Sequence, residues 1–313
     1  MKSRNYAGIS LLASLAACNS ATAETVQKNS TQAPQKPNVI VILADDLGYG
    51  DLKCYGAKNV ETPHVDKLAS EGIRFTNAHT VAATSTPSRY SLLTGEYAWR
   101  RPDTDIAAGD VKMIIRPEQY TMADMFKSAG YATAAIGKWH LGLGDKTGGQ
   151  DWNALLPAAL GDLGFDYHYI MAATADRVPC VFIENGKVAN YDPSDPIEVS
   201  YTKNFPGEPT GKDNPELLYN LHPSNGHDMS IVNGISRIGF MKGGGKALWK
   251  DENIADSITP FMPSTLSNSI KTSLSLCILQ PMMYTFLVFP MTASVERILW
   301  DYAETQSPNS TGR

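Results

Sequence analysis

The sequence predicts an α/β protein built on a mostly parallel central sheet that is flanked by helices. Three observations support this prediction: an apolar strand pattern without alternation near residue 40, helix-then-strand segments after it, and polar residues where those strands end. Strands buried on both faces are apolar throughout, and their alternation with helices is typical of parallel sheets. The length of 313 residues suits one large α/β domain or two ordinary ones.

The composition excludes several classes of protein. With 42% hydrophobic and 19% charged residues, the chain is not disordered as a whole. The net charge of −5 provides no general attraction to nucleic acid or to an anionic membrane. The 4 cysteines are scattered, which excludes a disulfide scaffold and a clustered zinc site.

Residues 1–17 are typical of an export signal, because a short basic start precedes an apolar run that is too short to cross a bilayer. The run ends Leu15-Ala16-Ala17-Cys18, which resembles a bacterial lipobox in which Cys18 is lipidated after cleavage. The alternative is cleavage after Ala21-Thr22-Ala23. Both alternatives predict an exported bacterial protein, either periplasmic or an outer-membrane lipoprotein that meets the membrane only through its lipid anchor. Residues 18–36 are polar and predict a disordered tether.

The first strand is expected over Asn38 to Ala44, whose apolar run predicts a central parallel strand covered on both faces. It ends at Asp45 and Asp46, where open α/β sheets bind their ligands. Adjacent like charges favour a divalent cation with oxygen ligands. The alternative is a solvated, Asp-rich turn.

Two helix-then-strand units follow. Thr62 is expected to cap a helix that ends at Gly72, and a short strand is expected over residues 73–76. The second unit is expected to have its helix over Thr121 to Ala129 and its strand over Tyr131 to Ile136.

Further polar residues stand at the ends of these elements. Lys138 and His140 follow the strand over residues 131–136, and a cation and an imidazole beside carboxylates suit an anionic substrate. Pro87 predicts a helix that starts just after Ser85, so Ser85 would lie at the positive helix end with Arg89 one turn inside. The residues alone therefore predict a site for an anion and a divalent metal. They assign no role to Ser85, which lacks a neighbouring base and a G-x-S-x-G turn.

Three motifs together resemble the type I sulfatases of the alkaline-phosphatase-like superfamily. Ser85 to Gly95 matches C/S-x-P-S-R-x-x-x-L-T-G with serine in the first place, and Gly130 to Gly142 matches G-Y-x-T-x-x-x-G-K-W-H-L-G. Asn38 to Asp51 matches the family's strand that ends in two aspartates. The resemblance covers residues 37–259 and implies the N-terminal part of an alkaline-phosphatase-like sandwich.

The resemblance also implies hydrolysis of sulfate esters, of carbohydrates or aryl alcohols, through a formylglycine made from Ser85. The serine form requires a radical-type anaerobic maturase. The implied metal is Ca²⁺ rather than Mg²⁺, and its site comprises Asp45, Asp46 and Ser85. The implied catalytic residues are Ser85, Arg89, Lys138 and His140.

Two histidines in the loop Leu221 to Asp228 are weaker candidates. His222 and His227 are expected either to face the substrate, where one protonates a leaving alcohol, or to have no role. Phosphodiesterases and phosphonate hydrolases of the same superfamily share the metal and strand-end layout. The motifs S-x-P-S-R and G-K-W-H-L-G favour sulfate over these alternatives.

The last 54 residues differ in character, since they hold only six charges and scattered prolines that disfavour a transmembrane helix. A frameshift near residues 258–260 explains them better. Read in the neighbouring frame, the codons of Trp300-Asp301-Tyr302 force Gly and Leu, and the following codons permit the familiar sulfatase segment G-L-R-G-D-A. Residues 260–313 are therefore expected to be out of frame and the sandwich incomplete at its C-terminal end. The alternative to an active sulfatase is then a truncated, weak or inactive product.

Overall fold

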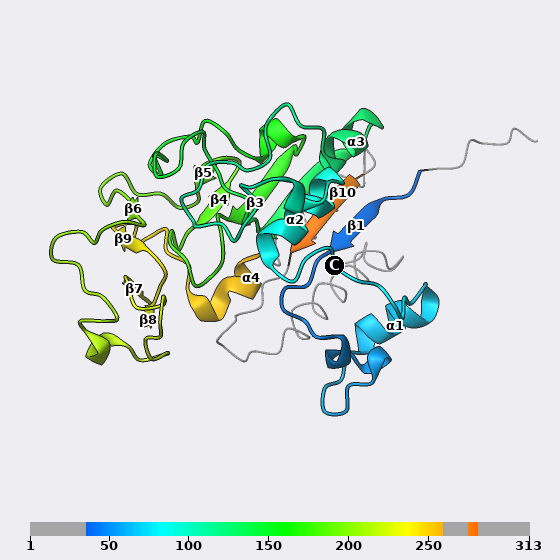
Figure 1. Ribbon diagram of the computed structural model, residues 1–313, viewed down its shortest axis with the longest axis horizontal. Helices are drawn as coiled ribbons and strands as arrows, with labels where there is room; N and C mark the ends of the chain where they lie inside the picture. The colour runs from blue at the N-terminus through cyan, green and yellow to red at the C-terminus, as the bar shows by residue number, and fades with distance from the viewer. Residues whose placement is uncertain (1–35, 259–274, 281–313) are drawn as a thin grey trace, which may run out of the picture. The chain divides into compact units, whose positions relative to one another are not determined.

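The structure of the protein is a computed structural model that describes residues 36–258 and 275–280 (Figure 1). The chain divides into two compact units, residues 1–36 and residues 37–313. The predicted export signal, the predicted lipidation site Cys18 and nearly all of the tether lie outside the described residues. No helix in the described ranges has the length and apolar character needed to cross a membrane.

A six-stranded sheet in the order β1-β10-β2-β3-β4-β5 forms the centre of the described structure (Figure 1). The pairs among the first four of these strands are parallel, and the last two pairs are antiparallel. The predicted mostly parallel sheet is thereby confirmed. The strands are β1 (Val39–Ile42), β10 (Ser275–Gln280), β2 (Ala132–Lys138), β3 (Tyr167–Met171), β4 (Phe182–Glu184) and β5 (Lys187–Val188).

Strand β1 differs from its prediction in its position. It pairs with β10 in parallel, yet it lies at the edge of the sheet within the described residues, and its residues are half-buried. The apolar run correctly indicated a parallel strand, but a run of this kind does not specify which neighbours cover its second face.

Strand β10 lies within the stretch predicted to be out of frame. It pairs with β1 on one side and β2 on the other, with Leu276 opposite both Val39 and Thr133. Parallel strands pair through backbone groups, so many different apolar sequences can form such a strand. The neighbouring frame permits the mostly apolar sequence K-P-F-F-L-Y-F-A here. A strand at this place is thus compatible with either frame, and the frameshift stays a prediction.

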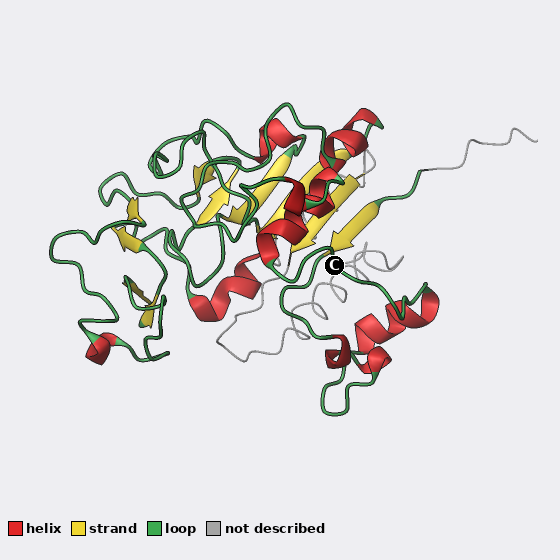
Figure 2. Ribbon diagram, in the orientation of Figure 1, coloured by secondary structure: helices red, strands yellow, loops and turns green. Residues whose placement is uncertain are grey.

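The helices confirm three predicted segments and are shown in red in Figure 2. Helix α3 begins with a capping box, in which the Thr121 hydroxyl accepts a hydrogen bond from Asp124 N and the Asp124 carboxylate accepts one from Thr121 N. Thr62 precedes α1 as predicted, but its hydroxyl accepts from Lys53 N and does not cap the helix. The α-helices are α1 (Pro63–Glu71), α2 (Ser85–Thr94), α3 (Met122–Ser128) and α4 (Ile254–Ile258).

The prediction of a strand over residues 73–76 is wrong. This segment is a loop in which Ile73 and Phe75 are 85% and 66% exposed. Its apolar residues alternate as in a strand, but no described strand pairs with it. A local pattern of side chains cannot supply the hydrogen-bonding neighbour that a strand requires.

Short elements complete the described structure. Two antiparallel pairs join β6 (Glu198–Ser200) to β9 (Phe240–Lys242) and β7 (Ile231–Val232) to β8 (Ile235–Ser236). Six 3₁₀ helices occur among the described residues: η1 (Tyr49–Asp51), η2 (Lys53–Tyr55), η3 (Ala98–Arg100), η4 (Leu160–Leu163), η5 (Pro215–Leu217) and η6 (Asp251–Asn253).

The inner strands β2 and β3 form the centre of the core, since each is buried beyond its first residue. Trp139 directly follows β2 and is itself buried, with its ring edge-on to Phe165. Its Nε1 donates to the Gly142 carbonyl over 2.8 Å. The segment that contains Lys138 and His140 is therefore held in the core rather than in a solvated loop.

Candidate active site

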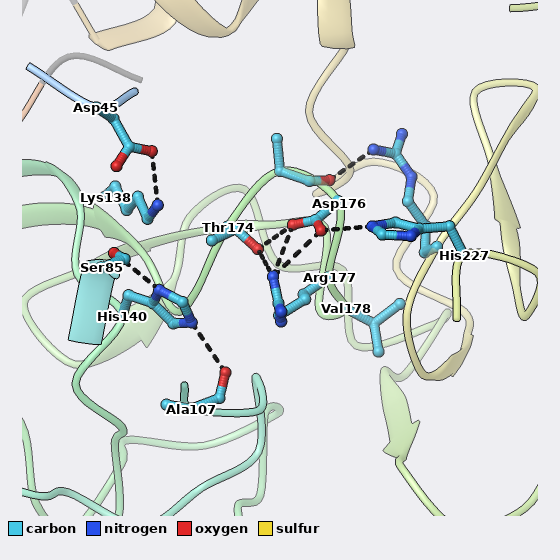
Figure 3. Close-up of polar contacts among 12 residues, drawn as sticks. Asp45, Ser85, Ala107, Lys138, His140, Thr174, Asp176, Arg177, Val178 and His227 are labelled. Carbon is cyan, nitrogen blue, oxygen red and sulfur yellow. Dashed lines mark hydrogen bonds and ion pairs between the residues drawn. The ribbon is translucent and has the colours of Figure 1, made fainter. Parts of the chain in front are cut away.

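The structure brings five of the predicted residues together at one edge of the sheet. Figure 3 shows four of them, Asp45, Ser85, Lys138 and His140. Asp45 follows β1, and Lys138 ends β2, so both leave the carboxyl ends of parallel strands. Ser85 is the first residue of α2, and Arg89 lies one turn further along the same helix. The remaining residue is His140.

Asp45 is the centre of a buried ionic group. Its carboxylate lies 2.6 Å from Lys138 Nζ and 3.3 Å from an Arg89 terminal nitrogen, and the three side chains are 10%, 5% and 1% exposed respectively. Burial, together with the charge of Arg89, lowers the pKa of Lys138, although Asp45 opposes this effect. Burial also lowers the pKa of Arg89, again against the attraction of Asp45. The two cations thus depend for compensation mainly on Asp45, with a smaller contribution from the charge of Asp46.

The Ser85 hydroxyl lies between an imidazole and a guanidinium. His140 Nε2 is 2.9 Å from the Ala107 carbonyl, which only accepts, so Nε2 holds the hydrogen. Burial, followed by the charges of Lys138 and Arg177, lowers the pKa of His140 to about 3, so the ring is neutral near pH 7. Its Nδ1, 3.0 Å from Ser85 Oγ, then accepts the serine proton, while Arg89 Nε donates to the same oxygen over 2.7 Å.

The backbone at His140 and Asp46 is left-handed, with φ angles of 58° and 55°. Such angles are uncommon for residues other than glycine and cost on the order of 1–3 kcal/mol. At His140 the surroundings fix this geometry, since its carbonyl accepts from the Thr86 hydroxyl over 3.0 Å and its N–H donates to the Ala172 carbonyl over 3.1 Å. The imidazole is therefore oriented by contacts with two other segments.

A cavity of about 210 Å³ opens beside this group and is lined by residues that include Asp45, Asp46 and Ser85. Their oxygens are the donor type that Ca²⁺ prefers. The described residues contain no cluster of three or more His, Cys, Asp or Glu arranged for a metal, and Ca²⁺ takes about six to eight oxygens. The residues present thus fit Ca²⁺ in donor type and supply part of its coordination shell.

The two loop histidines are placed differently. His222 is exposed. His227 is half-buried, and its Nε2 lies 2.8 Å from an Asp176 carboxylate oxygen (Figure 3). The sequence reasoning missed Asp176 and its neighbour Arg177, which belong to no motif. The signal that could have identified them is their position shortly after the end of a parallel strand, β3, which ends at Met171. The sequence analysis did not predict β3, so this signal was not used.

Comparisons with known proteins agree with this geometry. The sequence model of the Sulfatase family matches residues 37–220. The chain is 56% identical over 248 residues to the N-acetylgalactosamine-6-O-sulfatase of Bacteroides thetaiotaomicron, which covers 79% of this chain and 47% of that protein. It is 48% identical over 120 residues to the steryl-sulfatase of Mus musculus, covering 36% of this chain and 19% of that protein. The chain thus spans about half the length of the first of these relatives.

Solved structures show the same relationship. One from a study of glycosaminoglycan metabolism by Bacteroides thetaiotaomicron superposes with a TM-score of 0.82 at 47% identity, covering 87% of this chain and 59% of that chain. A crystal structure of Ps i-CgsB with k-i-k-neocarrahexaose has a TM-score of 0.55 at 22% identity, covers 86% of this chain and 55% of that chain, and supports the fold alone. The predicted alkaline-phosphatase-like α/β fold is confirmed, and the chain belongs to the sulfatase family.

Proposed function

We propose that the site around Ser85 hydrolyses sulfate esters of carbohydrates. The observation that supports this most directly is the position of Ser85 Oγ, within 3.0 Å of a neutral, oriented His140 and 2.7 Å of Arg89. The name of the relative that is 56% identical, an N-acetylgalactosamine-6-O-sulfatase, supports a sulfated amino sugar as the substrate.

We propose further that Ser85 is converted to formylglycine by a radical-type maturase and that Asp45 and Asp46 bind Ca²⁺. As the resemblance implies, a formylglycine at position 85 would supply the attacking hydroxyl, and a Ca²⁺ held by Asp45 and Asp46 would supply positive charge to the sulfate oxygens. The lining of the 210 Å³ cavity by Asp45, Asp46 and Ser85 supports both assignments.

We assign the remaining roles in catalysis to three side chains of the site. His140 holds Nδ1 as a proton acceptor beside position 85, because its Nε2 hydrogen is bound by Ala107. Arg89 and Lys138 supply two buried positive charges that stabilise negative charge on the sulfate. Since burial strengthens such interactions, these two cations favour an anionic substrate over a neutral one.

The test is hydrolysis by the full chain, produced together with a radical-type maturase. We expect release of sulfate from N-acetylgalactosamine 6-sulfate and from an aryl sulfate, and no release from a bis-aryl phosphate. Ser85→Ala is expected to abolish the activity, whereas Ser70→Ala, at an exposed serine of α1 outside the three motifs, is expected to retain it. Faster hydrolysis of the phosphate diester would favour a phosphodiesterase instead, and no hydrolysis by the converted chain would favour the truncated, inactive product.

We propose that the protein is exported and anchored through a lipid on Cys18. The basic start, the short apolar run and the lipobox-like Leu15-Ala16-Ala17-Cys18 support this. Labelling with a radioactive fatty acid in a bacterial host is expected to mark the wild type and not Cys18→Ala. Unlabelled wild-type protein whose N-terminus follows Ala23 would establish the alternative cleavage.

A further inference from the structure

Thr86 occupies the variable position of the S-x-P-S-R motif and takes no part in the steps above. It is the second residue of α2, and its exposed fraction is 0%. A buried hydroxyl group requires hydrogen-bonding partners, because burying it without them is costly. The partners of the Thr86 hydroxyl lie on two other segments of the chain, and both of these segments hold the imidazole of His140.

The Thr86 hydroxyl makes two hydrogen bonds of opposite direction. It donates to the His140 carbonyl over 3.0 Å and accepts from Ala107 N over 3.1 Å. A carbonyl only accepts and a backbone N–H only donates, so the direction of each bond is determined. The hydroxyl thereby bridges two backbone groups that lie 21 and 54 residues from it along the chain.

The two bridged residues determine different properties of the imidazole. The left-handed backbone of His140 determines where its ring begins. The Ala107 carbonyl accepts the Nε2 hydrogen over 2.9 Å, which leaves Nδ1 as the acceptor that faces Ser85 Oγ over 3.0 Å (Figure 3). The orientation of the ring and its tautomer therefore both depend on residues that the Thr86 hydroxyl holds.

Thr86 also belongs to the helix that carries the reacting position. Ser85 precedes it and Arg89 follows it on α2. Arg89 provides another link from this helix, since it donates to the Lys138 carbonyl over 2.9 Å, but that carbonyl lies two residues before His140. The Thr86 hydroxyl joins α2 both to His140 itself and to the carbonyl that binds its ring, so it contributes directly to the spacing between position 85 and the imidazole.

We infer that Thr86 is a positioning residue of the Ser85 site, whose hydroxyl keeps His140 in its Nε2–H tautomer with Nδ1 directed at position 85. The effect on the reaction rate rests on the proposed function, whereas the effect on the tautomer requires no catalysis. A misplacement of about 1 Å can lower a reaction rate by about a hundredfold, so loss of this bridge is expected to slow the reaction.

The test compares three variants of the full chain. Thr86→Val removes the hydroxyl and keeps the branched shape of the side chain, so both bridged backbone groups lose this partner. Thr86→Ser keeps the hydroxyl and is the conservative rescue. Thr86→Cys, whose thiol makes only weak hydrogen bonds, replaces Thr86→Val if that variant does not fold, and it is expected to give the same changes. Thermal unfolding verifies that each variant is folded.

Thr133→Val is the matched control for the loss of a buried hydroxyl. Thr133 is 2% exposed, and its hydroxyl likewise donates to a carbonyl, that of Gly164, over 2.6 Å and accepts from a backbone nitrogen, that of Asp166, over 3.0 Å. It is the second residue of β2, whereas Lys138 is the last, so it lies near the end of the strand that is remote from the site. A residue that acts only through stability is expected to behave in the same way at either position.

The first measurement is the tautomer of His140, read from the nitrogen chemical shifts of isotope-labelled histidine rings by NMR at one near-neutral pH. The spectrum of His140→Asn identifies the signal by its absence. The wild type, Thr86→Ser and Thr133→Val are expected to show the Nε2–H tautomer alone. Thr86→Val is expected to show the Nδ1–H tautomer as well, because the Ala107 carbonyl is no longer held against Nε2.

The second measurement is hydrolysis of N-acetylgalactosamine 6-sulfate, with each rate divided by the fraction of formylglycine that mass spectrometry finds at position 85. Thr86→Val is expected to lower kcat by roughly tenfold or more and to leave KM within about threefold, since Arg89 and Lys138 are retained. Thr86→Ser is expected to keep kcat within about threefold of the wild type. Thr133→Val is expected to change neither constant.

Three results would overturn the inference: the same changes in Thr86→Val and Thr133→Val, an unchanged tautomer in Thr86→Val, or a Thr86→Ser variant that resembles Thr86→Val. Each would leave the proposed function intact, because each concerns a variant and not the wild type. A converted wild-type chain that hydrolyses no sulfate ester would contradict the proposed function instead, and the NMR measurement would still decide the role of Thr86.

Discussion

At the scale of single residues, the stability of the site depends on Asp45, which is the partner of two buried cations. Lys138 and Arg89 are 5% and 1% exposed, and both reach the Asp45 carboxylate. Removing one partner of a buried ion pair leaves an uncompensated charge, which costs about 3–5 kcal/mol. The role of Asp45 is therefore structural as well as chemical.

We predict that Asp45→Asn lowers the free energy of unfolding by about 3 kcal/mol or more, measured by urea denaturation. Asp103→Asn, at a pair in which the carboxylate is 44% exposed, is expected to lower it by less than about 1 kcal/mol. Similar losses for the two variants would show that Asp45 is not the compensating charge.

A second prediction concerns pH. The pKa of His140 in the folded chain is about 3, whereas that of an exposed histidine is 6.5, so between these pH values the unfolded chain binds a proton there that the folded chain does not. Stability due to this residue is therefore complete above about pH 6.5 and falls as the pH drops toward 3, by at most about 1.4 kcal/mol per pH unit.

His140→Asn removes this contribution, so its curve of unfolding free energy against pH is expected to be flatter than that of the wild type over that range. Other groups also titrate in this pH range; burial lowers the pKa of His168 to about 4, for example. The wild type is therefore compared with the variant, so that the contributions of these groups cancel. Parallel curves would contradict a buried, neutral His140.

At the scale of elements, the G-K-W-H-L-G motif has a steric basis as well as a chemical one. Gly142 has a φ of +72°, and a Cβ atom there would lie 2.1 Å from the Lys112 carbonyl oxygen. The turn after His140 packs against the backbone of residues 111–112, and Leu143 N donates to the Val111 carbonyl over 3.0 Å. Only glycine fits this turn.

Gly142→Ala is thus expected to lower the free energy of unfolding by at least about 2 kcal/mol and to weaken sulfate binding, because the turn fixes His140. Gly50→Ala is the control, since a Cβ there meets nothing within 4 Å. Denaturation curves of the two variants provide the measurement, and equal stabilities would refute the steric argument.

The elements that the sequence predicted well are those with local determinants. Helix α3 has its cap at Thr121, and β2 is a mostly apolar segment that follows the glycine after the helix, so both were placed within two residues. The segment over residues 73–76 and the edge position of β1 depended on neighbouring strands, which a local pattern does not specify.

The residues of the candidate site also fall into those that the sequence identified and those that it did not. Motif residues such as Ser85 and His140 were found because their spacing along the chain is diagnostic. The Ala107 carbonyl that sets the tautomer of His140, and Arg177 beside it, come from segments without a motif. Their contribution depends on contacts between distant parts of the chain, which only the fold reveals.

At the scale of the whole molecule, the chain spans about half the length of the first curated relative above. The predicted frameshift can be tested on the gene itself, by sequencing the codons from 255 to 313. We expect the neighbouring frame to stay open and to encode the G-L-R-G-D-A segment across the codons from Trp300 to Gln306. Stop codons in that frame would contradict the prediction.

The central claim is that Ser85 is the reacting position of a sulfatase site, and mass spectrometry tests it most directly. The full chain is produced with a radical-type maturase, and the peptide that contains Ser85 is analysed, with Ser85→Ala as the control. We predict a mass loss that corresponds to oxidation of the Ser85 alcohol to an aldehyde and that is absent from the variant. An unmodified Ser85, in cells where the same maturase converts a second serine-type sulfatase, would contradict it.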